Sequence, residues 1–388
     1  MKKQTYKLLR FYKFIILWGP IFTLHVFYSN AQTVSPCPTD NLSNYPGAWK
    51  NFSGYSAPGH IKAKPGSYDK TAADANLEKL LDLAKKAYPK PMGGNANFTK
   101  HLDFSNVDDY LPFGHKLYIG HPGFVCTVGD KLTETFETGV YLVFHINNYA
   151  PFVFPVNAPE VPGTEQLIGA IDESDIFYGI NGKRVFLIHE NFVSSNGWMD
   201  HYTEKIYRDE IPRQQWYNIR RENTPLFSYV TRKEYLKQFR EEIKTYTDIY
   251  MRHVEDEYKK YPESFKQTYE GLDDYRKRVQ NGIRLVDEYL LNKSEDELGK
   301  PLSELIHFEF LLYSEDTELK FREDRFHLAF FNEEYLDKKL PLHIPQFIIV
   351  ELSAPAHDKT GKDSWKYNFR KKMMDGLDFT SIHNMLRK

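Results

Sequence analysis

The chain has 388 residues, of which 27% are charged, 41% hydrophobic and 15% aromatic, and its formal net charge is −2. The length suffices for one large domain or two modest ones. The charge balance argues against nucleic acid as a partner, and two cysteines cannot form the framework of a small disulfide-rich protein.

Residues 1–31 predict a cleaved signal peptide. Five Lys and Arg without an acid precede the apolar run IILWGPIFTLHVFYS, and Ser29-Asn30-Ala31 offers small residues for cleavage after Ala31. The alternative is an uncleaved anchor, but Pro20 and His25 interrupt a run shorter than the roughly 20 residues that span a bilayer. We therefore expect an exported protein, periplasmic or extracellular, with no stable membrane span after cleavage.

Removal of the signal peptide makes the protein more acidic. Lys and Arg fall from 51 to 46 against 53 acids, a net charge of −7, which also argues against an anionic membrane as partner. Cys37 and Cys126 remain, and an oxidising compartment would permit one disulfide between them. Two unpaired buried thiols are the alternative, because spacing alone does not establish a bridge.

The first regular elements follow an irregular Pro- and Gly-rich stretch at 32–70. Residues 73–88 repeat leucines at helical spacing and predict a helix. Short runs of β-branched and aromatic residues predict strands in 114–149, and Asn181-Gly182 predicts a β-hairpin over 175–192. The prolines of 151–163 favour a surface loop or an edge segment.

Residues 231–291 are charged and rich in tyrosine, and they predict two packed helices. Seven-residue repeats indicate a seam between the helices. The repeats are Leu236/Ile243/Tyr250, Phe239/Tyr246/His253, Phe265/Leu272/Val279/Val286 and Tyr269/Arg276/Ile283/Leu290. Tyr261-Pro262 divides the segment, so we expect a long antiparallel, coiled-coil-like helical hairpin, with a single kinked helix as the alternative.

Strands are expected again after this segment. Ser294 can cap a short helix, and ELIHFEFLLY, FHLAFF and PQFIIVEL are strand-like, followed by polar residues with two short helices. We predict an α+β fold, mostly antiparallel, divided into 32–228, a hairpin at 229–298, and 299–388 completing the body; two separate domains are the alternative.

Sequence motifs for known chemistry are absent. The chain lacks HExxH, CxxC, GxSxG, a phosphate loop and an EF-hand loop, so we expect no cofactor. His115 and His121 lie six residues apart, on one face of a strand, and are weak metal-ligand candidates that lack a third ligand. Ordinary surface or core histidines are the alternative.

A second weak group of candidate site residues lies close in sequence to the predicted hairpin. Glu190, Asp200 and His201 could supply acid–base catalysis if the fold brought them within hydrogen-bond reach. With 53 acids and 14 histidines in the chain, such neighbours also arise by chance. The many tyrosines could anchor a glycan or peptide, or simply fill the helical seam and the sheet core.

Three phrases carry a resemblance to a family. PGAW at 46–49, PLFSYVTRKEYL at 225–236 and FFNEEYLDKKLPLHIPQFIIVEL at 330–352 resemble uncharacterised secreted proteins of Bacteroidetes-type bacteria. The resemblance implies an exported bacterial protein and carries over no functional residue.

Two functions are consistent with these observations. The first is a non-catalytic binding protein of the cell envelope that engages a protein, peptide or glycan partner. The alternative is a secreted hydrolase that uses the His and carboxylate residues of 189–201.

Overall fold

The computed structural model describes most of the chain beyond residue 36, in two compact units. The described residues are 37, 41–52, 68–104, 114–135, 139–149, 153–155, 179–180, 183–189, 191–203, 213–303, 319, 321, 326–337, 339–356 and 364–387. Of these, Cys37 and Cys126–Thr133 form the smaller unit. A disulfide joins Cys37 to Cys126, so the alternative of two unpaired thiols does not apply.

The larger unit contains an eight-stranded sheet in the order β1-β2-β3-β6-β15-β12-β11-β10. Its strands are β1 (Trp49–Asn51), β2 (Ala96–Phe104), β3 (Gly114–Gly120), β6 (Tyr141–Ile146), β15 (Ile348–Ser353), β12 (Gln214–Ile219), β11 (Met199–Thr203) and β10 (Asn191–Ser195). Only β1 and β2 pair in parallel within it.

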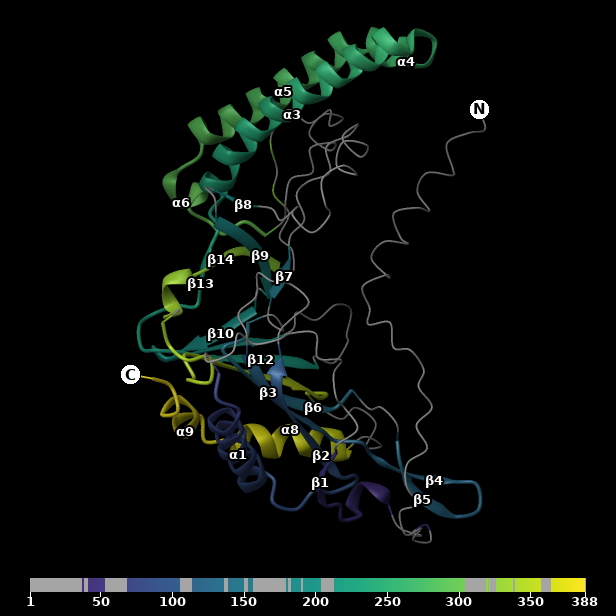
Figure 1. Cartoon of the computed structure of the whole chain (residues 1–388), viewed down its shortest axis with the longest axis vertical. Coiled ribbons are helices and arrows are strands. Elements are labelled where there is room, and N and C mark those ends of the chain that lie inside the picture. The colour runs from purple at the N-terminus through teal and green to yellow at the C-terminus, as the bar shows by residue number, and fades with distance from the viewer. Residues whose placement is uncertain are drawn as a thin grey trace. The chain divides into compact units, whose positions relative to one another are not determined.

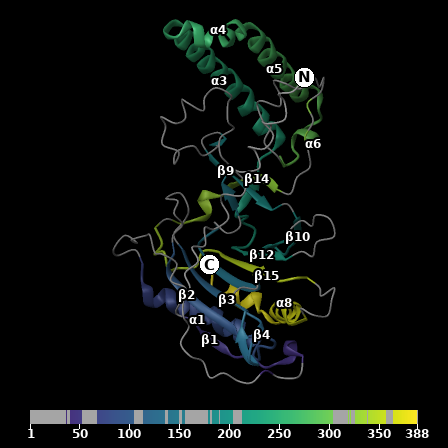
Figure 2. The ribbon, with the colours of Figure 1, turned by 90° about the vertical axis from the view of Figure 1, so that its right-hand side faces the viewer.

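Three helices cover one face of this sheet, and Figure 2 shows two of them, α1 and α8. They are α1 (Lys70–Ala87), α8 (Ser364–Gly376) and α9 (Phe379–His383). The carboxylate of Asp69 caps α1, so the predicted helix is confirmed and begins three residues earlier than expected. Alternate strand residues such as Leu117 and Phe144 are fully buried against these helices, as the period of two in a strand requires.

A five-stranded sheet lies in the same unit, in the order β13-β14-β9-β7 with β8 paired to β9. Its strands are β13 (Phe227–Tyr229), β14 (Phe326–Phe331), β9 (Lys183–His189), β7 (Val153–Pro155) and β8 (Gly179–Ile180). Ile180 pairs with Lys183, as a hairpin around Asn181-Gly182 requires, although those two residues lie outside the described part. Because β7 is an edge strand, it accommodates Pro155.

The remaining elements of the described residues are short. A two-stranded sheet pairs β4 (Phe124–Thr127) with β5 (Lys131–Glu134). Ser294 caps α6 (Glu295–Leu298), as predicted. The predicted strand ELIHFEFLLY lies outside the described residues. The described part as a whole is α+β, which confirms the predicted class.

Three helices occupy the charged segment (Figure 1): α3 (Arg232–Lys260), α4 (Pro262–Glu270) and α5 (Leu272–Asn292). The side chains of Thr231 and Glu234 form a capping box at the start of α3. The division at Pro262 was predicted. A second division at Gly271 was not, and it splits the expected second arm in two.

Ring stacks and an ion pair join α3 to the helices that follow it. Tyr258 stacks on Tyr269 with ring centroids 4.2 Å apart, Tyr250 lies 4.8 Å from Tyr275, and Arg240 Nε donates to Asp287 at 2.5 Å. These contacts join α3 to both α4 and α5.

Burial in α5 corrects one predicted heptad series. Leu272, Val279 and Val286 are buried, but Tyr269 and Arg276 of the second series are exposed. The other buried residues of α5 are Gly282, Leu285 and Tyr289. Tyr275, Ile283 and Leu290 are half-buried and pack against the core cluster that contains Val279 and Val286, so only Tyr269 and Arg276 of the second series depart from the predicted packing.

Candidate functional site

Asp200 and His201, two of the catalytic candidates, point to opposite faces of the eight-stranded sheet. They are adjacent in β11, so their side chains alternate. His201 stacks on Tyr217 at 4.3 Å, and Tyr217 belongs to the helix-covered core. Burial and the charge of Arg370 lower the pKa of His201 to about 4. The structure therefore does not bring this pair together, and Glu190 lies outside the described residues.

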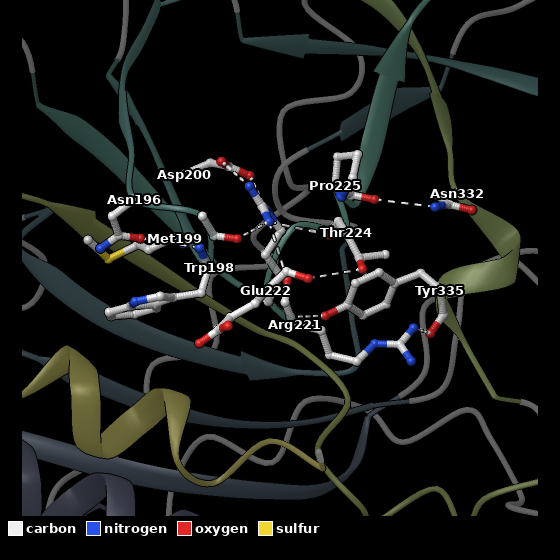
Figure 3. A network of polar contacts seen from close by, with 12 residues as sticks. Asn196, Trp198, Met199, Asp200, Arg221, Glu222, Thr224, Pro225, Asn332 and Tyr335 are labelled. Atoms are coloured by element: carbon white, nitrogen blue, oxygen red, sulfur yellow. Dashed lines mark hydrogen bonds and ion pairs between the residues drawn. The ribbon is translucent and has the colours of Figure 1, made fainter.

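Asp200 instead takes part in a buried ion pair with Arg220. Arg220 donates from Nε to Oδ2 at 2.7 Å and from Nη2 to Oδ1 at 2.8 Å, while its Nη1 donates to the backbone oxygen of Gly197 at 2.7 Å. Figure 3 shows this network beside the contact of Arg221 with Tyr335. A two-bond pair of this kind holds the ends of β11 and β12 together and leaves the carboxylate committed to Arg220.

The metal candidates His115 and His121 are fully buried on the helix-covered face, one face as predicted. His121 Nδ1 lies 2.8 Å from the backbone oxygen of Asn95, and the ring stacks on Phe369 at 4.9 Å. Burial lowers the pKa of each histidine to about 4. Within the described residues, no three potential ligands gather to hold a metal. The two histidines are core residues in this arrangement.

A cluster of ionisable side chains, none of them a sequence-predicted site residue, occupies the other face of the sheet. We call it the polar face and define it by His101, Lys116, Tyr141, His145 and Glu351. Lys116 lies directly opposite His101 on β2 and opposite His145 on β6, which makes a row across three strands. Glu351 on the next strand, β15, lies directly opposite Val143 of β6. Its side chain is therefore on the same face as Tyr141 and His145, which precede and follow Val143 by two residues.

Hydrogen bonds tie the carboxylate into this cluster. The hydroxyl of Tyr141 donates to Glu351 Oε1 at 2.9 Å, and His145 Nε2 lies 3.2 Å from Oε2. Because a carboxylate only accepts, Nε2 carries the proton and Nδ1 of the neutral ring is an acceptor. Nδ1 is buried and has no hydrogen-bond partner among the described residues.

Burial dominates the electrostatics of the polar face. It lowers the pKa of His145 despite the opposing effect of Glu351, and it lowers the pKa of Lys116. Burial, together with the charges of Lys116 and His145, lowers the pKa of His101 to about 4. Burial and Glu351 raise the pKa of Tyr141. At neutral pH both imidazoles are uncharged, and the face offers hydrogen-bond donors and acceptors.

A signal for this face was present in the sequence. In GHKLYIG, Lys116 and Tyr118 alternate with apolar residues, and Glu351 interrupts the apolar run IIVEL. Alternation assigns such residues to one face of each strand. It does not reveal that β3, β6 and β15 are neighbours, because β15 lies about two hundred residues further along the chain.

A second candidate surface is the outer part of the helical segment, residues 248–278. Val254 and Leu272 are buried there but belong to none of the three core clusters of the described residues. The inner residues Leu236, Phe239 and Ile243, in contrast, share a core cluster with the five-stranded sheet. Tyr261 and Tyr269 are 57% and 41% exposed in the outer part.

Comparisons with known proteins identify no relative. No protein-family description matches the chain, and neither a curated protein nor a solved structure is similar to it. Among the described residues, no helix combines the length and apolar character needed to cross a bilayer.

Proposed function

We propose that this chain is an exported, non-catalytic binding protein of a bacterial cell envelope, and that its helical segment engages a partner. The amino-terminal sequence and the resemblance to secreted proteins of Bacteroidetes-type bacteria support export. The Cys37–Cys126 disulfide is in keeping with an oxidising compartment.

In this proposal α3 and α4–α5 act as one antiparallel helical hairpin. The inner part of α3, up to Ile243, is anchored by the cluster it shares with β9 and β14. The 29 residues of α3 span about 44 Å at 1.5 Å per residue, which gives the hairpin considerable reach.

The observation that carries the proposal is the outer part, whose buried residues Val254 and Leu272 belong to no core cluster of the described body and whose half-buried Tyr275 only packs against the edge of one. Its helices are supported by their own stacks and by surface ion pairs, each worth only a few tenths of a kcal/mol. The pairs include Lys259–Asp256, Lys260–Glu257, Arg276–Asp273 and Arg278–Asp274. A paired-helix element that adds little to the core and exposes tyrosines is typical of a recognition surface.

The test is a cross-linking capture from the native envelope with residues 32–388 as bait. The comparison bait replaces 248–278 by a short linker, because Thr247 and Val279 are buried and the inner residues support the sheet. Capture of a partner by the intact bait alone supports the proposal. Equal capture by both baits, or by neither, contradicts it.

Matched single changes sharpen the result. Tyr261→Ser combined with Tyr269→Ser removes the exposed rings without touching the inner cluster. We expect this double variant to lose at least half as much captured partner as the bait without 248–278 loses. Phe52→Ser is the control, since Phe52 is a similarly exposed ring outside the helical segment.

A further inference from the structure

Residues from three separate segments of the chain line a pocket of about 230 Å³. We call it the two-arginine pocket and define it by Arg221, Asp337, Leu340, Gln346 and Arg387. The side chains of Asp337 and Arg387 are 46% and 53% exposed, so the pocket is open to solvent and a ligand can enter it.

A framework of hydrogen bonds holds one wall of this pocket in place. The hydroxyl of the fully buried Tyr335 accepts from the backbone N–H of Arg221 and donates to the backbone oxygen of Gln346 at 3.1 Å. The side-chain amide of Gln346 donates to the backbone oxygen of Asp337 at 3.2 Å and accepts from its backbone N–H at 2.7 Å. Lining residues that are fixed before a ligand arrives lower the entropy cost of binding.

The guanidinium of Arg221 is positioned by the same tyrosine. Its central carbon lies 4.3 Å from the centroid of the Tyr335 ring, and its Nη2 donates to the backbone oxygen of Tyr335 at 2.5 Å. In Figure 3 this guanidinium lies beside Tyr335 and apart from Asp200. Among the described residues, no carboxylate pairs with Arg221, and its Nη1 has no hydrogen-bond partner there. Its positive charge is therefore not neutralised within the described part of the chain.

The second guanidinium of the pocket has only a distant counter-charge. Nη1 of Arg387 lies 3.8 Å from Oδ2 of Asp337, which is longer than the about 2.7–2.9 Å of a charge-assisted hydrogen bond. Oδ1 of Asp337 accepts from the backbone N–H of Lys339 at 3.0 Å, and the backbone N–H of Arg387 donates to the oxygen of Pro345 at 2.9 Å. Both residues are thus held by other bonds, and the guanidinium has room for a closer acceptor.

The charge of the lining favours a ligand with a single negative charge. Two guanidinium groups and one carboxylate give the five lining residues a net charge of +1. A carboxylate balances this charge, and its two oxygens match the parallel N–H groups of a guanidinium. A phosphate dianion would leave an excess negative charge beside Asp337.

The volume of the pocket limits the size of the ligand. At roughly 30 Å³ per water molecule, it holds the equivalent of about seven or eight waters. This is less than the roughly 300–1,000 Å³ of a pocket for a drug-sized molecule. Half-buried Leu340 adds apolar surface to the lining. A carboxylate attached to a short apolar group fits both the size and the lining.

We propose that the two-arginine pocket binds a monocarboxylate, supplied by a small organic acid or by the C-terminal residue of a peptide. Arg221 and Arg387 hydrogen-bond the carboxylate, and Leu340 contacts the adjoining carbon atoms. The pocket contains no residue of the helical segment, so this site does not depend on the function proposed for that segment.

The test is a ligand-detected NMR titration of the 32–388 protein with N-acetyl-leucine at low ionic strength. We expect a Kd between about 0.1 and 5 mM. N-acetyl-leucinamide lacks the charge and should bind at least about tenfold more weakly, which corresponds to about 1.4 kcal/mol. Butyrate separates the two sources of the carboxylate: binding similar to that of N-acetyl-leucine supports a small acid, and much weaker binding supports a peptide terminus.

Two substitutions should change the affinity for N-acetyl-leucine in opposite directions. Arg387→Gln removes a cation and should weaken binding about tenfold or more. Asp337→Asn removes the opposing charge, keeps an oxygen to accept from Lys339, and should strengthen binding about threefold or more. A merely structural role of these residues would not produce opposite changes. Arg284→Gln is the matched control, because Arg284 of α5 is 50% exposed and lies outside the pocket, and it should bind as the parent does.

Four results would overturn the proposal. The first two are no binding of N-acetyl-leucine at about 20 mM and equal binding of the acid and its amide. The third is tighter binding of inorganic phosphate than of either carboxylate. The fourth is an affinity that neither Arg387→Gln nor Asp337→Asn changes, which would place the bound acid elsewhere on the protein.

Discussion

Removal of the Asp200 carboxylate should strongly destabilise the fold. Arg220 is 5% exposed and Asp200 is 7% exposed, so Asp200→Ala leaves a buried guanidinium without its counter-charge. Breaking a buried pair from one side costs about 3–5 kcal/mol. Arg220 keeps its bond from Nη1 to the Gly197 oxygen, so we place the loss at the lower end, about 3 kcal/mol.

Urea denaturation of the disulfide-intact protein, followed by far-UV circular dichroism, measures this loss as a lower midpoint with an unchanged slope. Asp273→Ala is the control, because it breaks the ion pair with Arg276 at a side chain that is 83% exposed, and it should cost under about 1 kcal/mol. A loss for Asp200→Ala as small as that of the control would refute the structural role assigned to this pair.

Three further outcomes are expected. The folded-state pKa of His121, about 4, lies below the unfolded value of 6.5, so its contribution to stability is complete above pH 6.5 and is lost as the pH drops toward 4, by about 3 kcal/mol at most. His121→Gln should flatten this part of the pH–stability curve. An unchanged curve would count against the burial of the ring. Thr231→Ala should cost about 1 kcal/mol in thermal melts through loss of the cap shared with Glu234, whereas no change would argue against the cap. Peptide mapping without reductant should recover a Cys37–Cys126 linked pair, and Cys37→Ser should lower stability by about 2–4 kcal/mol; recovery of two separate thiols would contradict the bridge.

Local signals in the sequence predicted the local structure well. The helical leucines gave α1, Ser294 marked the start of α6, and Asn181-Gly182 pointed to the pairing of β8 with β9. Each of these depends on residues within a few positions of one another, where backbone preferences act directly.

The candidate sites were harder to predict because they depend on which strands become neighbours. Asp200 and His201 are adjacent in sequence, yet alternation along β11 separates them, and Asp200 pairs with Arg220 on the next strand. The polar face requires β3, β6 and β15 side by side. Strand order follows from the packing of the whole sheet and not from any single segment.

The position of β15 has a consequence for how the protein must fold. It lies between β6 and β12, near the middle of the eight-stranded sheet, although it is the last strand among the described residues. Until residues 348–353 have been made, the strands on either side lack a shared edge to join them, and their apolar faces stay uncovered. Contacts this distant in sequence form slowly. The eight-stranded sheet should therefore be completed only after nearly all of the chain has been synthesised.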